Sequence, residues 1–163
     1  MNVITFRETS VTDATAHRLL GAYFAERART FPPAQGAYRT TFPTEEQFVT
    51  PAGVFLLVID ESGEAVGCGG IRRLHDGDTV RYEIKHLWVS PTTRGTGAGR
   101  ALLGELERRA ALFGAEEAVL DTNESLEAAG SLYRSSGYES IPPYNENPNA
   151  THWYAKRLMR SAG

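Results

Sequence analysis

Three glycines and two arginines are concentrated in one short segment of the chain, Arg94–Arg100. The preceding residues, Glu83–Val89, have the alternating β-branched and aromatic pattern of a strand, and the residues that follow have helical periodicity. The first amide groups of a helix lack intrahelical partners, and the helix dipole gives them a positive potential. Glycines let a ligand approach this backbone closely, and guanidinium groups pair with phosphate. The segment therefore predicts an anion site whose natural ligand is a phosphate or pyrophosphate.

Two widespread phosphate-binding motifs do not describe this segment. No GxxxxGK[ST] sequence occurs in the chain, so the segment is no Walker loop. Gly95, Gly97 and Gly99 have the spacing GxGxG. A dinucleotide-binding turn has the spacing GxGxxG instead, and it normally follows the first strand of its domain.

The segment resembles the acyl-CoA-binding motif of the GCN5-related N-acetyltransferases (GNAT), (Arg/Gln)-x-x-Gly-x-(Gly/Ala), which joins a strand to a helix. Arg94, Gly97 and Gly99 match the motif, and Leu87–Pro91 resembles the strand that leads into it. The resemblance implies that acetyl-CoA is the co-substrate. Its pyrophosphate would bind at the turn, while backbone amides of the strand hold the pantetheine and polarise the thioester carbonyl. The implied cofactor-binding residues are Leu87, Trp88, Val89, Arg94, Gly95, Thr96, Gly97, Ala98, Gly99 and Arg100.

The segment from Asn123 to Tyr138 resembles a second motif of the same family. In that motif an asparagine at a strand end contacts the cofactor, and a tyrosine on the next helix protonates the leaving thiolate. Asn123 and Tyr133 match these two positions. A phenol with a pKa of about 10 is protonated at neutral pH and can donate that proton. The alternative for Tyr133 is a core aromatic residue beside Leu132, and Tyr138 is interpreted as a packing residue.

Glu83 is the candidate general base, because it stands where histone-acetylating members of the superfamily carry a catalytic glutamate. Its alternative role is an ion pair with a neighbour such as Arg72 or Lys85. His86 is a second candidate base, but strand alternation predicts that it points away from Glu83. The alternation places Glu83, Lys85, Leu87 and Val89 on one face and Ile84, His86 and Trp88 on the other.

The resemblance places the acceptor pocket between the N-terminal helical region and the last hairpin. The candidate lining residues are Tyr23, Phe31, Tyr38 and Arg39 on one side and Tyr144, Asn145, Asn147, Asn149, His152 and Trp153 on the other. Positive charge in this region favours an amine that carries a carboxylate, such as an amino acid, over a polyamine. That charge comes from Arg39, Arg72, Arg81 and Lys85. The run Pro142–Pro148 can equally be a solvated cover or a dimer contact, since the closing hairpins of this fold often pair between subunits.

Size and composition limit the class of protein. A chain of 163 residues suits one domain with a real core. A net charge of -3 does not favour binding to nucleic acid or to an anionic membrane. No apolar run approaches the ~18 residues of a membrane span. Cys68 is the single cysteine and is interpreted as a small buried residue, and four scattered histidines offer no metal-ligand spacing. We expect a cytoplasmic protein without metal, nucleic-acid or membrane partners, since no signal-peptide layout is present.

Periodicity and turn residues predict an α+β fold. The predicted strands are Val3–Arg7, Gly53–Asp60, Glu64–Arg73, Thr79–Val89, Ala118–Thr122, Tyr138–Ile141 and His152–Leu158. The predicted helices are Ala14–Arg29, a short one from Pro43–Glu46, one that opens at the glycine turn and stops at Gly114, and Leu126–Ser136. This order matches the acetyltransferase fold across the chain. It implies a single domain, residues 1–163, with a mostly antiparallel, splayed mixed sheet and helices on both faces.

The residues and the resemblance together predict an N-acetyltransferase that moves acetyl directly from acetyl-CoA to a primary amine. We expect a small-molecule acceptor such as an amino acid or a related metabolite. The alternatives are a protein or peptide N-acetyltransferase, a non-catalytic acyl-CoA-binding sensor, and a structural protein whose glycine turn binds nothing. Glu83 and Tyr133 together argue against the sensor.

Overall fold

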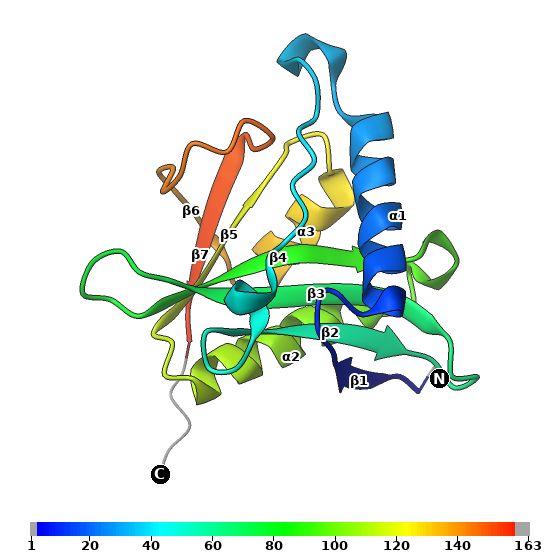
Figure 1. Cartoon of the computed structure of the whole chain (residues 1–163). Helices are drawn as coiled ribbons and strands as arrows, with labels where there is room; N and C mark the ends of the chain where they lie inside the picture. The colour runs from blue at the N-terminus through cyan, green and yellow to red at the C-terminus, as the bar shows by residue number, and fades with distance from the viewer. Residues whose placement is uncertain (1–2, 159–163) are drawn as a thin grey trace.

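A seven-stranded sheet forms the centre of the protein in the computed structural model, which describes residues 3–158 (Figure 1). The two ends of the predicted 1–163 domain therefore lie outside the described residues. The strands are β1 (Thr5–Glu8), β2 (Gly53–Ile59), β3 (Ala65–Leu74), β4 (Arg81–Val89), β5 (Glu117–Thr122), β6 (Glu139–Ile141) and β7 (His152–Arg157). They lie in the order β1-β2-β3-β4-β5-β7-β6. Every neighbouring pair is antiparallel except β4 and β5, so the predicted mixed, mostly antiparallel fold is confirmed.

The parallel strands β4 and β5 pair over only part of their length. Their register runs from Arg81 opposite Glu117 to Glu83 opposite Val119, and it ends there. Figure 1 shows the two strands moving apart beyond this point. The second half of β4 therefore has a backbone edge that β5 does not cover, which is the predicted splay of the sheet.

Helices cover both faces of the sheet. The α-helices are α1 (Ala14–Thr30), α2 (Ala98–Leu112) and α3 (Glu127–Ser135), and the 3-10 turns are η1 (Pro33–Gln35), η2 (Glu45–Phe48) and η3 (Pro91–Thr93). Asp13 caps α1, since its carboxylate accepts hydrogen bonds from the amides of Thr15 and Ala16. The predicted short helix from Pro43 is instead the 3-10 turn η2. Its four residues give too few repeating hydrogen bonds for a stable α-helix.

Two apolar clusters fix the positions of the two long helices. On one face, Leu20 and Phe24 of α1 pack with Phe55 and Cys68 of the sheet. On the other face, Leu102 and Leu106 of α2 belong to a larger cluster that includes Ile71, Ile84, Leu120 and Tyr133. Cys68 is fully buried, as predicted, and burial raises the pKa of its thiol to about 12, so it carries no thiolate at neutral pH.

A β-bulge interrupts β4 near the sheet centre. Lys85 lies opposite Gly70 and Trp88 lies opposite Cys68, so two residues of β4 face one residue of β3. His86, within the bulge, has a φ of 57°, which is uncommon for a residue other than glycine. Because the bulge adds one residue, the alternation of side chains shifts beyond Lys85.

The predicted alternation along β4 is therefore wrong in its second half. The His86 ring contacts Tyr23 and Phe24 of α1, with ring centroids 5.6 Å and 5.5 Å away. Leu87 packs in the cluster that contains α2. His86 consequently shares a face with Glu83 and Trp88, and Leu87 does not.

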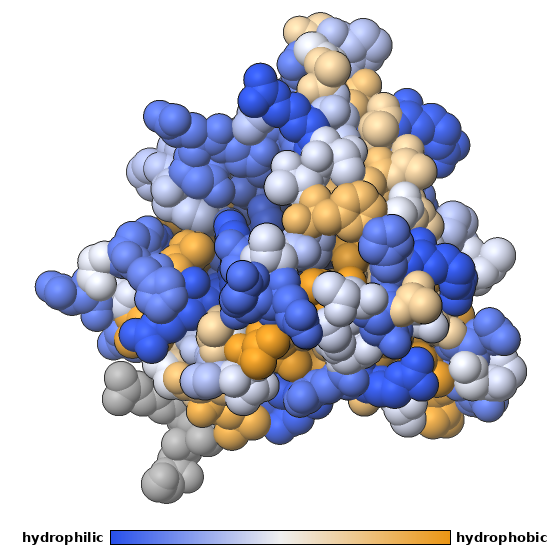
Figure 2. All heavy atoms as spheres, in the orientation of Figure 1, coloured by the Kyte–Doolittle hydropathy of each residue, from blue (hydrophilic) through white to orange (hydrophobic). Residues whose placement is uncertain are grey.

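The large hydrophobic residues exposed within residues 3–158 are Val3, Phe42, Val49 and Leu112. Figure 2 shows hydrophobic residues in small separate patches among hydrophilic ones on the face that it displays. No helix within residues 3–158 is long and apolar enough to cross a membrane.

Leu106 and Leu112 of α2 provide a matched test of the core. Leu106 is fully buried and Leu112 is 60% exposed. We expect Leu106→Ala to lower the free energy of unfolding by about 2–5 kcal/mol, because it leaves a cavity under the sheet. Leu112→Ala should change it by less than about 0.5 kcal/mol. Urea unfolding followed by circular dichroism measures both, and equal losses would contradict this packing.

Candidate active site

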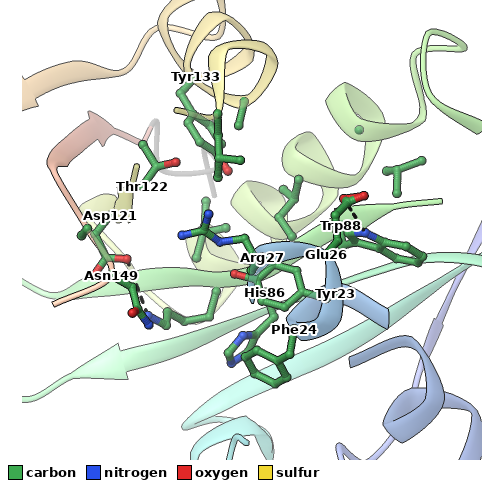
Figure 3. Close-up of a pocket in the computed structure, with 18 of the residues that line it drawn as sticks. Tyr23, Phe24, Glu26, Arg27, His86, Trp88, Asp121, Thr122, Tyr133 and Asn149 are labelled. Atoms are coloured by element: carbon green, nitrogen blue, oxygen red, sulfur yellow. Dashed lines mark hydrogen bonds and ion pairs between the residues drawn. The ribbon is translucent and has the colours of Figure 1, made fainter. Parts of the chain in front are cut away.

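A cavity of about 1010 Å³ lies where β4 and β5 separate, between α1, α3 and the first turn of α2 (Figure 3). Of the residues predicted to bind cofactor or to catalyse, most line it: Leu87, Trp88, Val89, Arg94, Gly95, Gly97, Gly99, Arg100 and Tyr133. The predicted residues Glu83, Thr96, Ala98 and Asn123 are not part of its lining. The tertiary structure thus brings the glycine turn and Tyr133 to one space, although they lie far apart in the sequence.

The glycine turn presents bare backbone to the cavity. Gly97 is the N-cap of α2, has a φ of 89°, and provides no side chain to cap the helix. Gly95 also has a positive φ, and at either glycine a Cβ would meet no atom within 4 Å from the rest of the described chain beyond its local backbone. The first amides of α2 are therefore available to a ligand, and open space lies beside them. This geometry fits a phosphate group.

Both arginines of the turn have partners within the chain. The Arg94 guanidinium bonds both carboxylate oxygens of Glu26 at 2.7 and 2.6 Å, and it donates to the carbonyl of Val89 at 2.9 Å. Arg100 donates to the hydroxyls of Ser135 and Ser136 on and after α3. Arg94 therefore connects the turn to α1, and Arg100 connects it to α3, so three elements of the cavity wall are joined at this point.

Tyr133 projects from α3 into the cavity (Figure 3). Its ring is buried against Tyr138 and Tyr154, and its hydroxyl has no hydrogen-bond partner among the described residues. Burial raises the pKa of Tyr133 to about 12, and the Asp121 carboxylate adds to the effect. The phenol is therefore protonated at neutral pH and is free to donate to a ligand.

Glu83 lies at the point where β4 and β5 part. It is fully buried, and its carboxylate accepts hydrogen bonds from the Arg72 Nε at 2.8 Å and the Tyr144 hydroxyl at 2.7 Å. Burial and the Glu83 carboxylate raise the pKa of Tyr144, which keeps that phenol a donor. This is the ion pair that the sequence analysis gave as the alternative role. A base role for Glu83 stays a prediction.

His86 lines the cavity from the face where Glu83 also lies. Its Nδ1 is buried and has no hydrogen-bond partner within residues 3–158. Burial lowers its pKa to about 3, with further lowering by Lys85 and Arg72, so the imidazole is neutral at neutral pH. A neutral ring with so low a pKa accepts a proton only weakly. Its role as a second candidate base stays a prediction.

Asn123 has a structural set of partners. Its amide nitrogen donates to the Gln35 side chain at 2.6 Å and to the Asn149 carbonyl at 3.1 Å, while its oxygen accepts from the Ser125 amide. The cofactor contact predicted for Asn123 stays a prediction.

Thr96 donates a hydrogen bond to the carbonyl of Thr93 and so stabilises the glycine turn from within. No group of three or more His, Cys, Asp or Glu residues in the described part could hold a metal ion.

Only some of the residues predicted to form the acceptor pocket line the cavity. The predicted residues that line the cavity are Tyr23, Tyr38, Arg39, Arg72, Lys85, Asn145, Asn147 and Asn149, whereas Phe31, Arg81, Tyr144, His152 and Trp153 do not. Asn149 accepts a hydrogen bond from the Arg39 amide and donates one to the Arg39 carbonyl. Trp153 donates to Asn145, which in turn donates to Asp121. The loop before β7 is thereby fixed to the segment after α1.

Several cavity residues were missed by the sequence analysis. Glu26 and Arg27 of α1 and Asp121 of β5 all line the cavity. Arg27 had a detectable signal, because the spacing of Leu20, Phe24 and Arg27 puts a charged residue on the apolar stripe of its helix. A charge at such a position is uncommon without a partner or a function.

The comparison with known families agrees with this geometry. A profile described as "Acetyltransferase (GNAT) family" matches residues 18–138. The chain belongs to this family. An N-acetyltransferase of Schizosaccharomyces pombe of uncharacterized role is 36% identical over 98 residues, 60% of this chain and 59% of that protein. An IAA acetyltransferase of Azospirillum brasilense is 29% identical over 88% of both chains. The family and these named relatives support an acetyltransferase enzyme.

Solved structures of the same fold cover nearly all of the chain. A Klebsiella pneumoniae protein assigned to the acyl-CoA N-acyltransferases has a TM-score of 0.74 and 28% identity, and the match covers 98% of this chain and 99% of that one. An N-acetylglutamate synthase of Neisseria gonorrhoeae, solved with coenzyme A and N-acetyl-glutamate, has a TM-score of 0.70 and 18% identity. That match covers 97% of this chain and 36% of the synthase, and it shows the fold alone.

The Tyr144 hydroxyl provides a test of the buried Glu83 cluster. We expect Tyr144→Phe to lower the free energy of unfolding by about 1–3 kcal/mol, because a buried carboxylate loses one of its two donors. Tyr133→Phe is the matched control, since its hydroxyl has no partner in the described chain, and it should unfold like the wild type. Urea unfolding measures both. Loss of stability in Tyr133→Phe alone would contradict this assignment.

Proposed function

We propose that this protein transfers acetyl from acetyl-CoA directly to the primary amine of a small molecule. The observation that carries the proposal is the single cavity that joins the uncapped glycine turn of α2 to the protonated phenol of Tyr133. An anion-binding turn and a proton donor are the two groups that cleavage of an acyl-CoA thioester uses. The family membership of the chain supports the same chemistry.

The residues of the chain fit acetyl-CoA along the separated strands. The amides at the start of α2, beside Gly97, would hold the pyrophosphate. The backbone of Leu87–Val89 would align the pantetheine and thioester, because β5 does not pair with this part of β4. Donors that are fixed before the reaction stabilise the charge that develops on a carbonyl oxygen.

Tyr133 acts as the general acid in this proposal. The neutral amine attacks the thioester carbon, so a nitrogen–carbon bond forms and the carbon–sulfur bond breaks with its electron pair on sulfur. Tyr133 donates its phenol proton to that sulfur. The nitrogen loses one proton to water and the phenolate regains one from water, so CoA thiol and the N-acetyl product are the only net products.

A small acceptor is favoured over a protein segment. Two hydrogen bonds between Arg39 and Asn149 join the segment after α1 to the loop before β7, and both residues line the cavity. Aromatic side chains of α1 and its following segment, including Tyr23, Phe24 and Tyr38, form the apolar part of the wall. A peptide in extended form needs an open groove, which this connection obstructs.

Gly97 provides a test of cofactor binding. We expect Gly97→Val to weaken binding of acetyl-CoA by at least about tenfold, because a β-branched residue disfavours φ near 89° and covers the amides of α2. Gly104→Val is the matched control, since Gly104 lies later on the same helix with open space beside it. Isothermal titration calorimetry with acetyl-CoA measures both proteins. Unchanged affinity in Gly97→Val would rule out this turn as the phosphate site.

Tyr133→Phe tests the general acid. We expect kcat to fall on the order of 100-fold or more, while the Kd for acetyl-CoA is unchanged. The wild-type kcat should show no loss from this group below about pH 10, because the raised pKa of Tyr133 keeps the phenol protonated there. Thiol release at several pH values measures kcat. Full activity in Tyr133→Phe would refute the acid role, and tight acetyl-CoA binding without turnover on any amine would favour the acyl-CoA sensor.

A further inference from the structure

Two buried side-chain nitrogens in the described part of the chain have no hydrogen-bond partner, and both belong to the same cavity. They are Arg27 Nη1 and His86 Nδ1. Nearly all buried polar groups in folded proteins are paired, so each exception requires an explanation. Because both of these nitrogens belong to residues that line one cavity, they indicate a ligand whose polar groups form the missing hydrogen bonds.

Arg27 is the more informative of the two, because a buried cation without an ion-pair partner is costly. Its side chain comes from the apolar side of α1 and is 8% exposed. Its guanidinium lies over the Tyr38 ring, 5.0 Å from the centroid. Figure 3 shows it pointing into the cavity, between Tyr133 and His86.

The acids near Arg27 are already paired with other groups. Glu26 on the same helix binds Arg94 and accepts a weak hydrogen bond from Trp88. Asp121 across the cavity lies 3.7 Å from the Lys85 ammonium and accepts a hydrogen bond from Asn145. No carboxylate within residues 3–158 forms a salt bridge with Arg27. An anion for this guanidinium therefore comes from a ligand.

The location of Arg27 indicates which ligand supplies the anion. The phosphates of acetyl-CoA fit the glycine turn at the start of α2, and the thioester end beside Leu87–Val89 is uncharged. The Arg27 guanidinium lies over the ring of Tyr38. Arg39, which follows Tyr38 in the chain, is hydrogen-bonded to Asn149 in the loop before β7. This is the wall that the acceptor contacts, so the missing anion belongs to the amine substrate.

We propose that Arg27 binds the carboxylate of the acceptor, and that the substrate is an α-amino acid or a closely related amino carboxylate. This inference rests on the proposed acetyl transfer and names its substrate class. A carboxylate matches the planar guanidinium and would supply the acceptor that Nη1 lacks. The amine, a few bonds from that carboxylate, then lies on the Tyr133 side of the cavity. The aromatic wall accepts an apolar side chain, and the charge of Arg27 disfavours polyamines.

The test compares acceptors that differ only in the carboxylate. Wild-type protein is assayed by thiol release with acetyl-CoA and the twenty L-amino acids, the amides of the best substrates, spermidine and a short peptide amide. We expect turnover on one or more free amino acids, with kcat/KM lower by on the order of 100-fold on the matched amides. Amides, spermidine or the peptide reacting as well as the free amino acids would overturn the inference and leave the acetyl transfer intact.

Arg27→Gln assigns the effect to this side chain. We expect its kcat/KM on the preferred amino acid to fall on the order of 100-fold, mainly through KM, with no such fall on the matched amide. The Kd for acetyl-CoA and the circular dichroism spectrum should match the wild type. Arg18→Gln is the control, because Arg18 is an exposed arginine on the same helix. Equal losses on acid and amide would contradict a carboxylate contact.

A binding measurement separates this inference from the acetyl transfer on which it rests. The melting temperature is measured for wild type and Arg27→Gln with CoA and each of the twenty amino acids at millimolar concentration. Absence of acetyl-CoA binding or of any amine turnover would remove the proposed function. In that case an amino acid that stabilises wild type but not Arg27→Gln would still support the carboxylate site, and no difference between the proteins would refute it.

Discussion

The separation of β4 and β5 beyond Glu83 is the constraint on which the rest of the site depends. Parallel pairing ends at the Glu83–Val119 position, and the second half of β4 keeps a backbone edge that β5 does not cover. Such an edge is a liability in a sheet unless something occupies or covers it. Here the edge lines a cavity, and Glu83 holds the start of the separation through Arg72 and Tyr144. A buried carboxylate with two good donors is costly to disrupt, so the opening is built into the fold.

The charges around the cavity are divided between structure and function. Arg94 and Arg100 connect the glycine turn to α1 and α3, so they fix the position of the start of α2 in the cavity wall. Glu26 and Asp121 are likewise paired within the chain. Arg27 is the exception among these groups. Its guanidinium lies over the Tyr38 ring, and it forms no salt bridge with a carboxylate within residues 3–158, so it leaves a positive charge in the cavity wall.

The bulge in β4 shows how a local irregularity changes the composition of a site. One added residue rotates His86 onto the face of α1, where its ring packs between Tyr23 and Phe24. Strand alternation is a reliable guide only while the register is unbroken, and the register between β3 and β4 shifts at Cys68/Gly70. The predicted faces were therefore correct through Lys85 and wrong beyond it. Leu87, Trp88 and Val89, which follow the bulge, line the cavity.

The sequence by itself determined the strand–turn–helix junction at Arg94–Arg100, the order of the elements and the position of Tyr133 on α3. These follow from local signals, such as glycines that allow positive φ, apolar periodicity and helix caps, which act over a few residues. Only the tertiary structure decided that Glu83 is paired with Arg72 and Tyr144, and that Arg27 lines the cavity without a salt bridge to any carboxylate within residues 3–158. Such pairings join residues far apart in the chain. They depend on register, on the bulge and on which groups compete for each charge, and none of these is a property of a short segment.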